Sequence, residues 1–324
     1  MPRAQILAVQ GRQARAAKRA AVGTLGANVI SAVSVKRYEK AVALFLTFLS
    51  NVWQCELQTT GQLDVAVSAY LALWQEGEGR TMGNYVLAAI HWFLPEVKRK
   101  LVSSWRLLRA WDKLELPARA TPASPGLLLA VCELLAREAH ERLAFMLVIA
   151  FSLFLRTSEI LAFRRGDVEF GAEEAVMTLK VSKGISKRSY ASVERLVVRD
   201  PLALGCLKRL CEGLEPGDAL VMMSVAEFRR LWATSIKRLG LEGENYLPYA
   251  IRRGGATLFF RQTNNLPLTM MVGRWAHMRT ARIYLEDGLM VLAGTRFSPE
   301  VKSLLAAGAR EFLKRLSVKR PSAR

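Results

Sequence analysis

The chain has 324 residues, 51% of them apolar, which is enough for a buried core and excludes global disorder. Its 47 lysines and arginines outnumber 28 acidic residues and give a formal net charge of +19. A charge of this sign attracts polyanions, so it favours nucleic acid as the partner, with an acidic membrane surface as the alternative.

Other protein classes are disfavoured by patterns that the sequence lacks. The longest apolar run, Leu143 to Leu155, has 13 residues, whereas a helix needs about 20 to span a bilayer, so we predict a buried helix and no membrane partner. The four cysteines form no CxxC pair and the three histidines lie far apart, which disfavours a disulfide frame or a metal site. No hydrophobic signal region opens the sequence, so we expect an intracellular protein, nuclear if eukaryotic and cytoplasmic if bacterial or phage-encoded.

The first 115 residues predict a flexible arm followed by a helical module. The arm, residues 1–27, is rich in arginine, alanine and glycine. Apolar side chains then recur at helical spacing through residues 28–115. They predict four helices, at about 34–49, 63–76, 81–93 and 97–111.

Residues 116–125 contain three prolines and predict a linker, because proline removes a backbone donor and disfavours helix in the residue before it. A second domain then covers residues 126–324. Ser124 and Pro125 supply an N-cap and a first-turn proline for its first helix.

Helices dominate this second domain as well. Two are predicted at about 125–138 and 141–155, and β-branched segments at 176–182 and 195–199 predict two strands joined by a basic turn. The predicted fold class is therefore mainly α with a small antiparallel β-sheet.

A further helix is predicted at about 225–239, opening with a capping box of Ser224 and Glu227. Its apolar positions face the core, and the opposite side carries Arg229 and Arg230. These two arginines either contact DNA or belong to a solvated helix face.

Four basic segments carry the functional argument, and the first contains Arg156 and Glu159 at the end of the long apolar helix. A nearly buried arginine needs a partner, and a carboxylate one turn later can orient its guanidinium. The pair is either a structural ion pair or part of a functional site.

The second segment is the basic turn between the two strands, which contains Lys180, Lys183 and Lys187. A lysine on a β-turn can reach a phosphate or protonate a leaving oxygen. A solvated basic loop is the alternative.

The third segment, residues 248–257, contains Arg252 and Arg253 followed by Gly254 and Gly255. Paired glycines permit close approach of another backbone, and Arg252 can offer a planar fork of donors to phosphate oxygens.

The fourth segment places Tyr284 nine residues after Trp275, among arginines that include Arg274. Cations favour phenolate and neutralise phosphate, so a phenol in this setting suits attack on a phosphodiester. Most tyrosines only pack in a core or cap a helix, so this segment alone is weak evidence. Together with the three segments before it, it indicates a specific site.

The order and spacing of the four segments resemble the tyrosine recombinase, or phage integrase, family over about residues 125–290. The family pattern has an arginine in G-L-R-x-S-E-L, a lysine in a β-hairpin, H-x-L-R-H-x-x-A-T, and L-G-H/W with a tyrosine nine residues on. The matching residues are Arg156, Arg252, Ala256, Thr257, Trp275 and Tyr284. The motif sequences G-R-W…T-A-R-I-Y and R-R-G-G-A-T are most similar to those of the retroelement-type members of the DIRS and Crypton group.

The resemblance implies a helical, SAM-like core-binding domain at 28–115 and a tyrosine recombinase catalytic domain after the linker. It implies a site-specific recombinase or integrase that cleaves and rejoins double-stranded DNA through a 3′-phosphotyrosyl link. Such a protein needs no metal, cofactor or small-molecule substrate, and acts as a homotetramer on two DNA sites.

The resemblance also assigns roles to residues. Tyr284 is the expected nucleophile, Arg156 and Arg252 the clamp on the non-bridging oxygens, Lys183 the acid for the leaving oxygen, and Trp275 a buttress for the phosphate. DNA contacts are expected from Arg253, Arg274, Lys187, Arg229 and Arg230.

One position departs from the family pattern, because Tyr249 stands where the family commonly has histidine. A phenol has a pKa near 10 against about 6.5 for imidazole, so it is the poorer proton acceptor at neutral pH. The lysine assignment also stays open, since Lys180 and Lys187 compete with Lys183. A catalytically silent DNA-binding protein and a type IB topoisomerase therefore remain alternatives to a recombinase.

The chain closes with an amphipathic stretch over about 301–316, in which apolar residues recur roughly one turn apart. Such a helix can dock on a neighbouring subunit or pack on its own domain.

Overall fold

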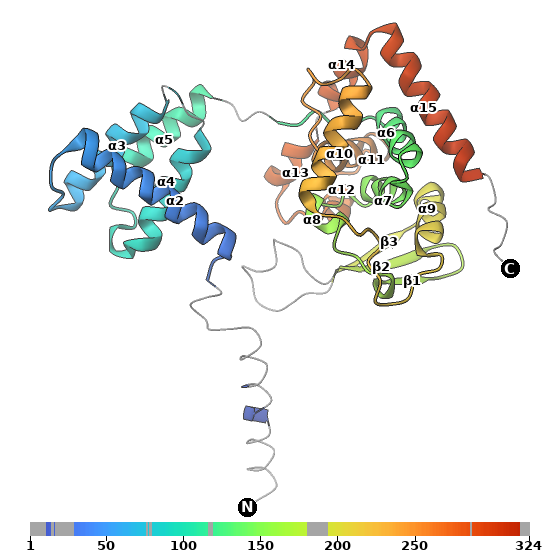
Figure 1. Cartoon of the computed structure of the whole chain (residues 1–324), viewed down its shortest axis with the longest axis horizontal. Coiled ribbons are helices and arrows are strands. Elements are labelled where there is room, and N and C mark those ends of the chain that lie inside the picture. Colours follow the sequence, from blue (N-terminus) through green and yellow to red (C-terminus); the bar gives the residue numbers. More distant parts are fainter. Residues whose placement is uncertain are drawn as a thin grey trace, which may run out of the picture. The chain divides into compact units, whose positions relative to one another are not determined.

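The computed structural model describes residues 11–13, 16, 29–75, 77, 80–115, 119–179, 194–285 and 287–317. The chain folds into two compact units, residues 1–118 and 119–324 (Figure 1). The division falls inside the proline-containing segment 116–125.

The first unit is built from four helices around one apolar core. They are α2 (Ala32–Phe48), which continues into a π-helical turn (Leu49–Trp53), α3 (Thr60–Gln75), α4 (Arg80–Phe93) and α5 (Val102–Leu114). All four predicted helices are present. The last begins five residues later than predicted, because a 3-10 turn at Pro95–Val97 and a left-handed Arg99 (φ 70°) precede it.

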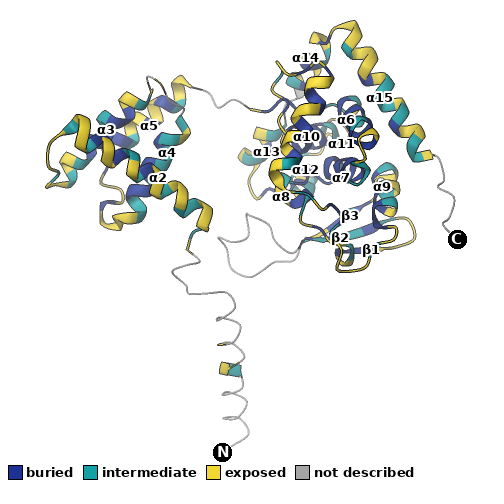
Figure 2. Ribbon diagram, viewed as in Figure 1, coloured by how far each residue is buried: buried dark blue, intermediate teal, exposed yellow. Residues whose placement is uncertain are grey.

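The second unit surrounds a helix that is buried on nearly every side. Its helices are α6 (Pro125–Arg137), α7 (Glu141–Ser152), α8 (Thr157–Ile160), α9 (Pro201–Cys211), α10 (Val225–Arg238), α11 (Ala250–Thr263), α12 (Leu266–Gly273), α13 (Met278–Tyr284), α14 (Asp287–Arg296) and α15 (Pro299–Ser317). Every residue of α7 from Leu143 to Phe151 is buried, as its dark blue ribbon in Figure 2 shows. A helix that is apolar all round requires such a position.

One small sheet lies beside these helices, with antiparallel strands in the order β1-β2-β3. The strands are β1 (Val168–Phe170), β2 (Ala175–Leu179) and β3 (Glu194–Val198). Met177 of β2 lies opposite Val168 on one side and Leu196 on the other. The predicted class, mainly α with a small antiparallel sheet, is confirmed. Strand β1 was not predicted, since three residues are too few to display an alternating pattern.

The long apolar helix is shorter than predicted, and this changes the setting of Arg156. Helix α7 ends at Ser152, and Phe154 adopts a left-handed conformation (φ 49°). Arg156 is therefore not the last residue of α7 but the extended N-cap of the short helix α8.

The C-terminal helix α15 packs on α6 of its own unit, which decides between the two predicted alternatives. Phe312 is fully buried and Leu305 nearly so. Glu133 of α6 accepts hydrogen bonds from Arg315 of α15 at 3.0 and 3.2 Å. Arg209 donates to the last carbonyls of α15 at 2.7 and 2.9 Å, which satisfies groups that a helix end leaves without partners.

No helix within the described ranges has both the length and the apolar run that a membrane span requires.

Two glycines allow α11 to approach α7 and the segment before α6. A Cβ added at Gly255 would overlap the Phe151 carbonyl oxygen, and one at Gly254 would overlap that of Ala123. Both obstacles are backbone atoms, which cannot rotate away. The paired glycines therefore determine how closely α11, whose first turn carries Arg252, packs against α7 and the segment before α6.

We expect Gly255→Ala to destabilise the second unit by about 3 kcal/mol, because overpacking against backbone forces the two helices apart. For a unit of this size, that lowers the melting temperature by roughly 6–12 °C, measured by circular dichroism. The matched control is Gly205→Ala in α9, where nothing lies within 4 Å of an added Cβ and where alanine should stabilise by about 0.5–1 kcal/mol. Equal melting of Gly255→Ala and the wild type would contradict the packing argument.

Candidate active site

Arg252 lies at the centre of the site that the second unit builds. It comes from the first turn of α11 and is fully buried. Its Nη2 donates to the Gly273 carbonyl at 2.7 Å, and its Nη1 donates to the Phe154 carbonyl. The rings of Trp275 and Tyr284 each lie 5.2 Å from its Cζ, within the range of a cation–π contact.

Burial lowers the pKa of Arg252, and the neighbouring charges of Arg156 and Arg274 lower it further, to about 10. The guanidinium therefore still carries its charge at neutral pH. A buried charge of this kind is stabilised by carbonyl dipoles and aromatic faces in place of water.

Tyr284 is the last residue of α13, and its ring lies against the buried arginine. The ring centroid is 4.5 Å from that of Trp275, and Thr257 donates a 3.1 Å hydrogen bond to the Tyr284 backbone carbonyl. Two of the predicted motifs, on α11 and α13, thus meet around one phenol.

Arg156 approaches the site from the start of α8, with its side chain 24% exposed. Its Nη1 lies 2.5 Å from Oε1 of Glu159, and its backbone N–H donates to Oε2 at 2.8 Å. Glu159 is buried, so the predicted orientation of Arg156 by this carboxylate is present in the structure.

Tyr249 precedes α11 and brings a second phenol to the site. Its hydroxyl contacts the hydroxyl of Tyr284, and the ring centroids are 5.5 Å apart. Burial raises the pKa of Tyr249 well above its ordinary value, with a further rise from Tyr284 and a partial offset from Arg252 and Arg156. The phenol is therefore neutral at physiological pH and can share a hydrogen bond but is a weak base.

Two of the predicted DNA contacts are buried in the structure. Arg253 is only 2% exposed. Arg274 has 8% of its side chain exposed and pairs with Glu159 and Glu194. Neither side chain is on the surface, so their direct contacts with DNA stay predictions. The sequence offered only their charge, which does not reveal burial.

The remaining predicted contacts divide into two groups. Arg229 and Arg230 are exposed on α10, and Arg229 lines a cleft of about 750 Å³ whose other lining residues include Thr157 and Tyr249. Lys183 and Lys187, and the competing Lys180, lie outside the described residues, so their roles stay predictions.

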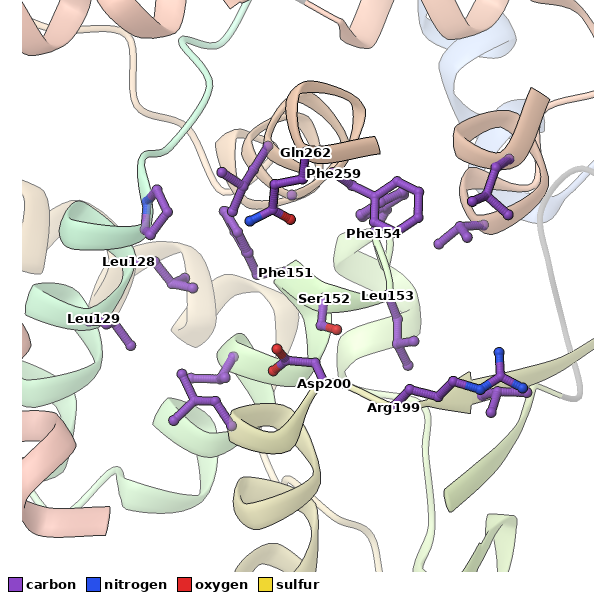
Figure 3. A pocket seen from close by; sticks show the side chains of 18 of the residues that line it. Leu128, Leu129, Phe151, Ser152, Leu153, Phe154, Arg199, Asp200, Phe259 and Gln262 are labelled. Carbon is purple, nitrogen blue, oxygen red and sulfur yellow. The ribbon is translucent and has the colours of Figure 1, made fainter. Parts of the chain in front are cut away.

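A pocket of about 500 Å³ in the second unit is lined mainly by apolar side chains (Figure 3). Phe154 forms part of its wall, and the same ring stacks on Trp275 at 6.4 Å between centroids. Arg199 and Asp200 are the charged residues of its lining. Arg156, Arg252 and Arg274 are not among the residues that line this pocket, so it is separate from the arginine cluster of the site.

The first unit holds a basic groove that the sequence analysis missed. Its volume is about 420 Å³, and its lining includes His91 and Trp105, whose rings stack at 5.8 Å. Four exposed cations share this groove, namely Lys98, Arg99, Arg106 and Arg109. A signal existed in the run of basic residues at 98–100 and the i, i+3 spacing of the two arginines on α5, but a solvated helix face has the same pattern.

Within the described part of the chain, no three or more histidine, cysteine, aspartate or glutamate residues lie together as a metal site would require.

No protein-family model matches the chain, and no curated protein matches it in sequence. Solved structures do match it in fold. The XerH site-specific recombinase bound to palindromic difH substrate in a post-cleavage complex is 15% identical, with a TM-score of 0.59 over 81% of this chain and 79% of that chain. A lambda integrase dimer bound to a COC′ core site is 14% identical, with a TM-score of 0.58 over 81% and 92%.

The Tn1549 transposon integrase in complex with circular intermediate DNA is also similar, at 12% identity and a TM-score of 0.59 over 83% of this chain and 95% of that chain. Identities this low show the fold alone. Both units are included in the likeness, since more than four fifths of the chain is covered in each comparison.

Proposed function

We propose that this chain, whose fold is that of the tyrosine recombinases, is a DNA strand transferase with Tyr284 as its nucleophile. The observation that carries the proposal is the packing of Tyr284 against the buried guanidinium of Arg252, with Arg156 beside them. Arginines beside a phenol favour its attack on a phosphodiester, because they stabilise negative charge on both groups. A tyrosine that only packs in a core needs no such cations.

In the proposed reaction, Oη of Tyr284 forms a bond to the scissile phosphorus as the bond to the 5′ oxygen breaks. The products are a 3′-phosphotyrosyl link and a free 5′-hydroxyl. Arg156 and Arg252 stabilise the charge that develops on the non-bridging oxygens. The phenolic proton of Tyr284 passes to water, because the neutral hydroxyl of Tyr249 beside it is too weak a base to accept it. Lys183 is proposed to protonate the 5′ oxygen.

The arrangement of Arg252 adds one requirement. Its guanidinium is fully covered, with the Tyr284 ring on its face. Its in-plane Nη donors are held by the Phe154 and Gly273 carbonyls, so a DNA phosphate reaches Arg252 only after the groups around it rearrange. We propose that the same rearrangement separates the hydroxyl of Tyr284 from that of Tyr249.

The covalent link conserves the energy of the phosphodiester, so a 5′-hydroxyl from another strand can reverse the attack without a high-energy cofactor. Recombination or integration of DNA follows naturally when that hydroxyl belongs to a second duplex. Exchange of both strands of two duplexes needs four nucleophiles, and we therefore propose a homotetramer on two DNA sites. The comparison structures hold a palindromic difH substrate, circular intermediate DNA and a COC′ core site, which supports DNA as the substrate of this chain.

Residues 28–115 are proposed as the core-binding domain that holds the DNA, with the basic groove at its surface. Cations that line a groove bind the phosphate backbone independently of sequence. Arg229 and Arg230 on α10 provide a second exposed basic surface beside the cleft of Tyr249. The protein is accordingly expected to be associated with DNA in the cell.

A catalytically silent DNA-binding protein is the second candidate, and Tyr249 is the observation that favours it. A neutral phenol stands where the family commonly uses an imidazole. This phenol is hydrogen-bonded to the hydroxyl of Tyr284, the proposed nucleophile. A type IB topoisomerase shares the chemistry but relaxes supercoils as a monomer without a specific site, so a relaxation assay separates it from a recombinase.

We expect an SDS-resistant covalent adduct on labelled, nicked duplexes taken from the flanks of the protein's own gene. Tyr284→Phe should abolish the adduct and keep DNA binding, because only the nucleophilic oxygen is lost. Tyr85→Phe, which removes a phenol from the first unit, should form the adduct as the wild type does. An adduct with Tyr284→Phe would refute the assignment, and binding without any adduct would favour the silent protein.

Tyr249→His should accelerate single-turnover cleavage at pH 7 by at least about tenfold, since an imidazole accepts a proton near neutral pH and general-base catalysis contributes roughly 10²–10⁴-fold. The pKa of the phenol is raised, so the wild type lacks such a base. The gain should fall away below about pH 6.5, where imidazole is protonated. Tyr249→Phe is the control and should show no gain, and an equal rate for Tyr249→His and the wild type would exclude a base at this position.

Removing two groove charges with Arg106→Gln and Arg109→Gln should weaken DNA binding and lower the slope of log affinity against log salt by about 2, close to one unit for each lost phosphate contact. Titrations by fluorescence anisotropy at several salt concentrations measure this slope. Arg199→Gln removes an exposed charge of the second unit and should leave the slope nearly unchanged. An unchanged slope in the double variant would place the DNA on another surface.

A further inference from the structure

We infer that Arg274 is a positioning residue that fixes the carboxylate of Glu159 and thereby the guanidinium of Arg156. The inference rests on the proposed function, since it gives Arg274 a part in presenting Arg156 to the phosphate. It replaces the direct DNA contact that the sequence suggested for Arg274.

The two oxygens of Glu159 are divided between the two arginines. Oε1 receives Nη1 of Arg156 at 2.5 Å. Oε2 receives the backbone N–H of Arg156 at 2.8 Å and Nη2 of Arg274 at 2.6 Å. With Oε2 occupied by these two donors, the Arg156 side chain pairs with Glu159 through Oε1.

The second arm of Arg274 reaches the sheet. Its Nε lies 3.2 Å from Oε2 of Glu194, the first residue of β3, in an ion pair without hydrogen-bond alignment. Its Nη1 and Nη2 lie 3.5 Å from the carbonyls of Leu153 and Phe154. Arg274 therefore connects the start of α8, the start of β3 and the turn after α12, three segments that are far apart in sequence.

The backbone of Arg274 is consistent with a specific requirement for this side chain. The residue caps α12 in a left-handed conformation, φ 57° and ψ 45°, where glycine fits without strain and other residues do not. The family pattern L-G-H/W also has glycine at this place. An arginine that accepts the strain needs compensating contacts, and its buried ion pairs provide them.

Charge balance explains why the contact matters for Arg156. Two arginines, Arg156 and Arg274, add to the effect of burial in lowering the pKa of Arg252. Glu159 and Glu194 oppose the lowering of the pKa of Arg274. Without Arg274, Oε2 of Glu159 keeps the backbone N–H of Arg156 but can accept a second hydrogen bond from the Arg156 side chain. A bidentate pair then holds the guanidinium against the carboxylate and away from a phosphate.

The test is single-turnover cleavage of nicked DNA at saturating protein by Arg274→Met, which keeps an unbranched side chain and removes the charge. We expect cleavage roughly 10- to 100-fold slower than in the wild type, the effect of a misplaced group, with DNA affinity unchanged. Arg274→Gly should show the same defect, and glycine suits the left-handed backbone even if the methionine variant does not fold. Arg199→Met, which removes an arginine from an exposed pair with Glu174, should cleave at the wild-type rate.

A second substrate distinguishes positioning from a general loss of structure. DNA with a neutral methylphosphonate at the scissile position needs less cationic stabilisation, so it reduces the demand on Arg156. The deficits of Arg274→Met and Arg156→Ala, each relative to wild type, should both shrink at least tenfold on this substrate.

A wild-type rate for both Arg274 variants, or an equal deficit on the two substrates, would overturn the positioning role. Absence of an adduct with the wild-type protein would overturn the proposed function and this inference with it. The two failures are therefore distinct.

Discussion

Arg252 carries a full positive charge in a place that water does not reach, and the second unit is arranged around it. Two carbonyls, of Phe154 and Gly273, receive its donors, and two aromatic rings cover its faces. Two backbone features help to bring Arg252 and the Phe154 carbonyl together: Gly255 lets α11 lie against α7, and Phe154 adopts a left-handed conformation shortly after α7 ends. A charge buried without these partners would be strongly destabilising.

A phosphate-binding site must bring like charges together before its ligand arrives. Here Arg156, Arg252 and Arg274 lie close to one another, and the carboxylates of Glu159 and Glu194 reduce their repulsion. In the proposed function, these carboxylates also compete with the DNA phosphate for the arginine donors. The number of carboxylate oxygens that are already hydrogen-bonded therefore matters as much as the carboxylate charge. The ring of Tyr284 also lies against Arg252 and helps to keep water away from its charge.

The two units divide the work in the proposed function. The first presents exposed cations in a shallow groove, which suits binding to many phosphates. The second unit keeps Arg252 buried and Arg156 largely covered, and these two arginines are proposed to contact a single phosphate. Affinity and chemistry thus depend on arginines in opposite environments, and composition alone cannot tell the two kinds apart.

The sequence by itself determined the helical class, the four basic segments and the identity of the central residues, since hydrophobic period and fixed spacing are local properties. The family resemblance proposed roles for Arg252 and Tyr284, and the structure packs their side chains together. Only the tertiary structure decided that Arg253 and Arg274 are buried and that α15 packs on its own unit. Burial and ion pairing depend on which distant segments meet, as Glu159 and Arg274 do across 115 residues, and no local pattern records that meeting.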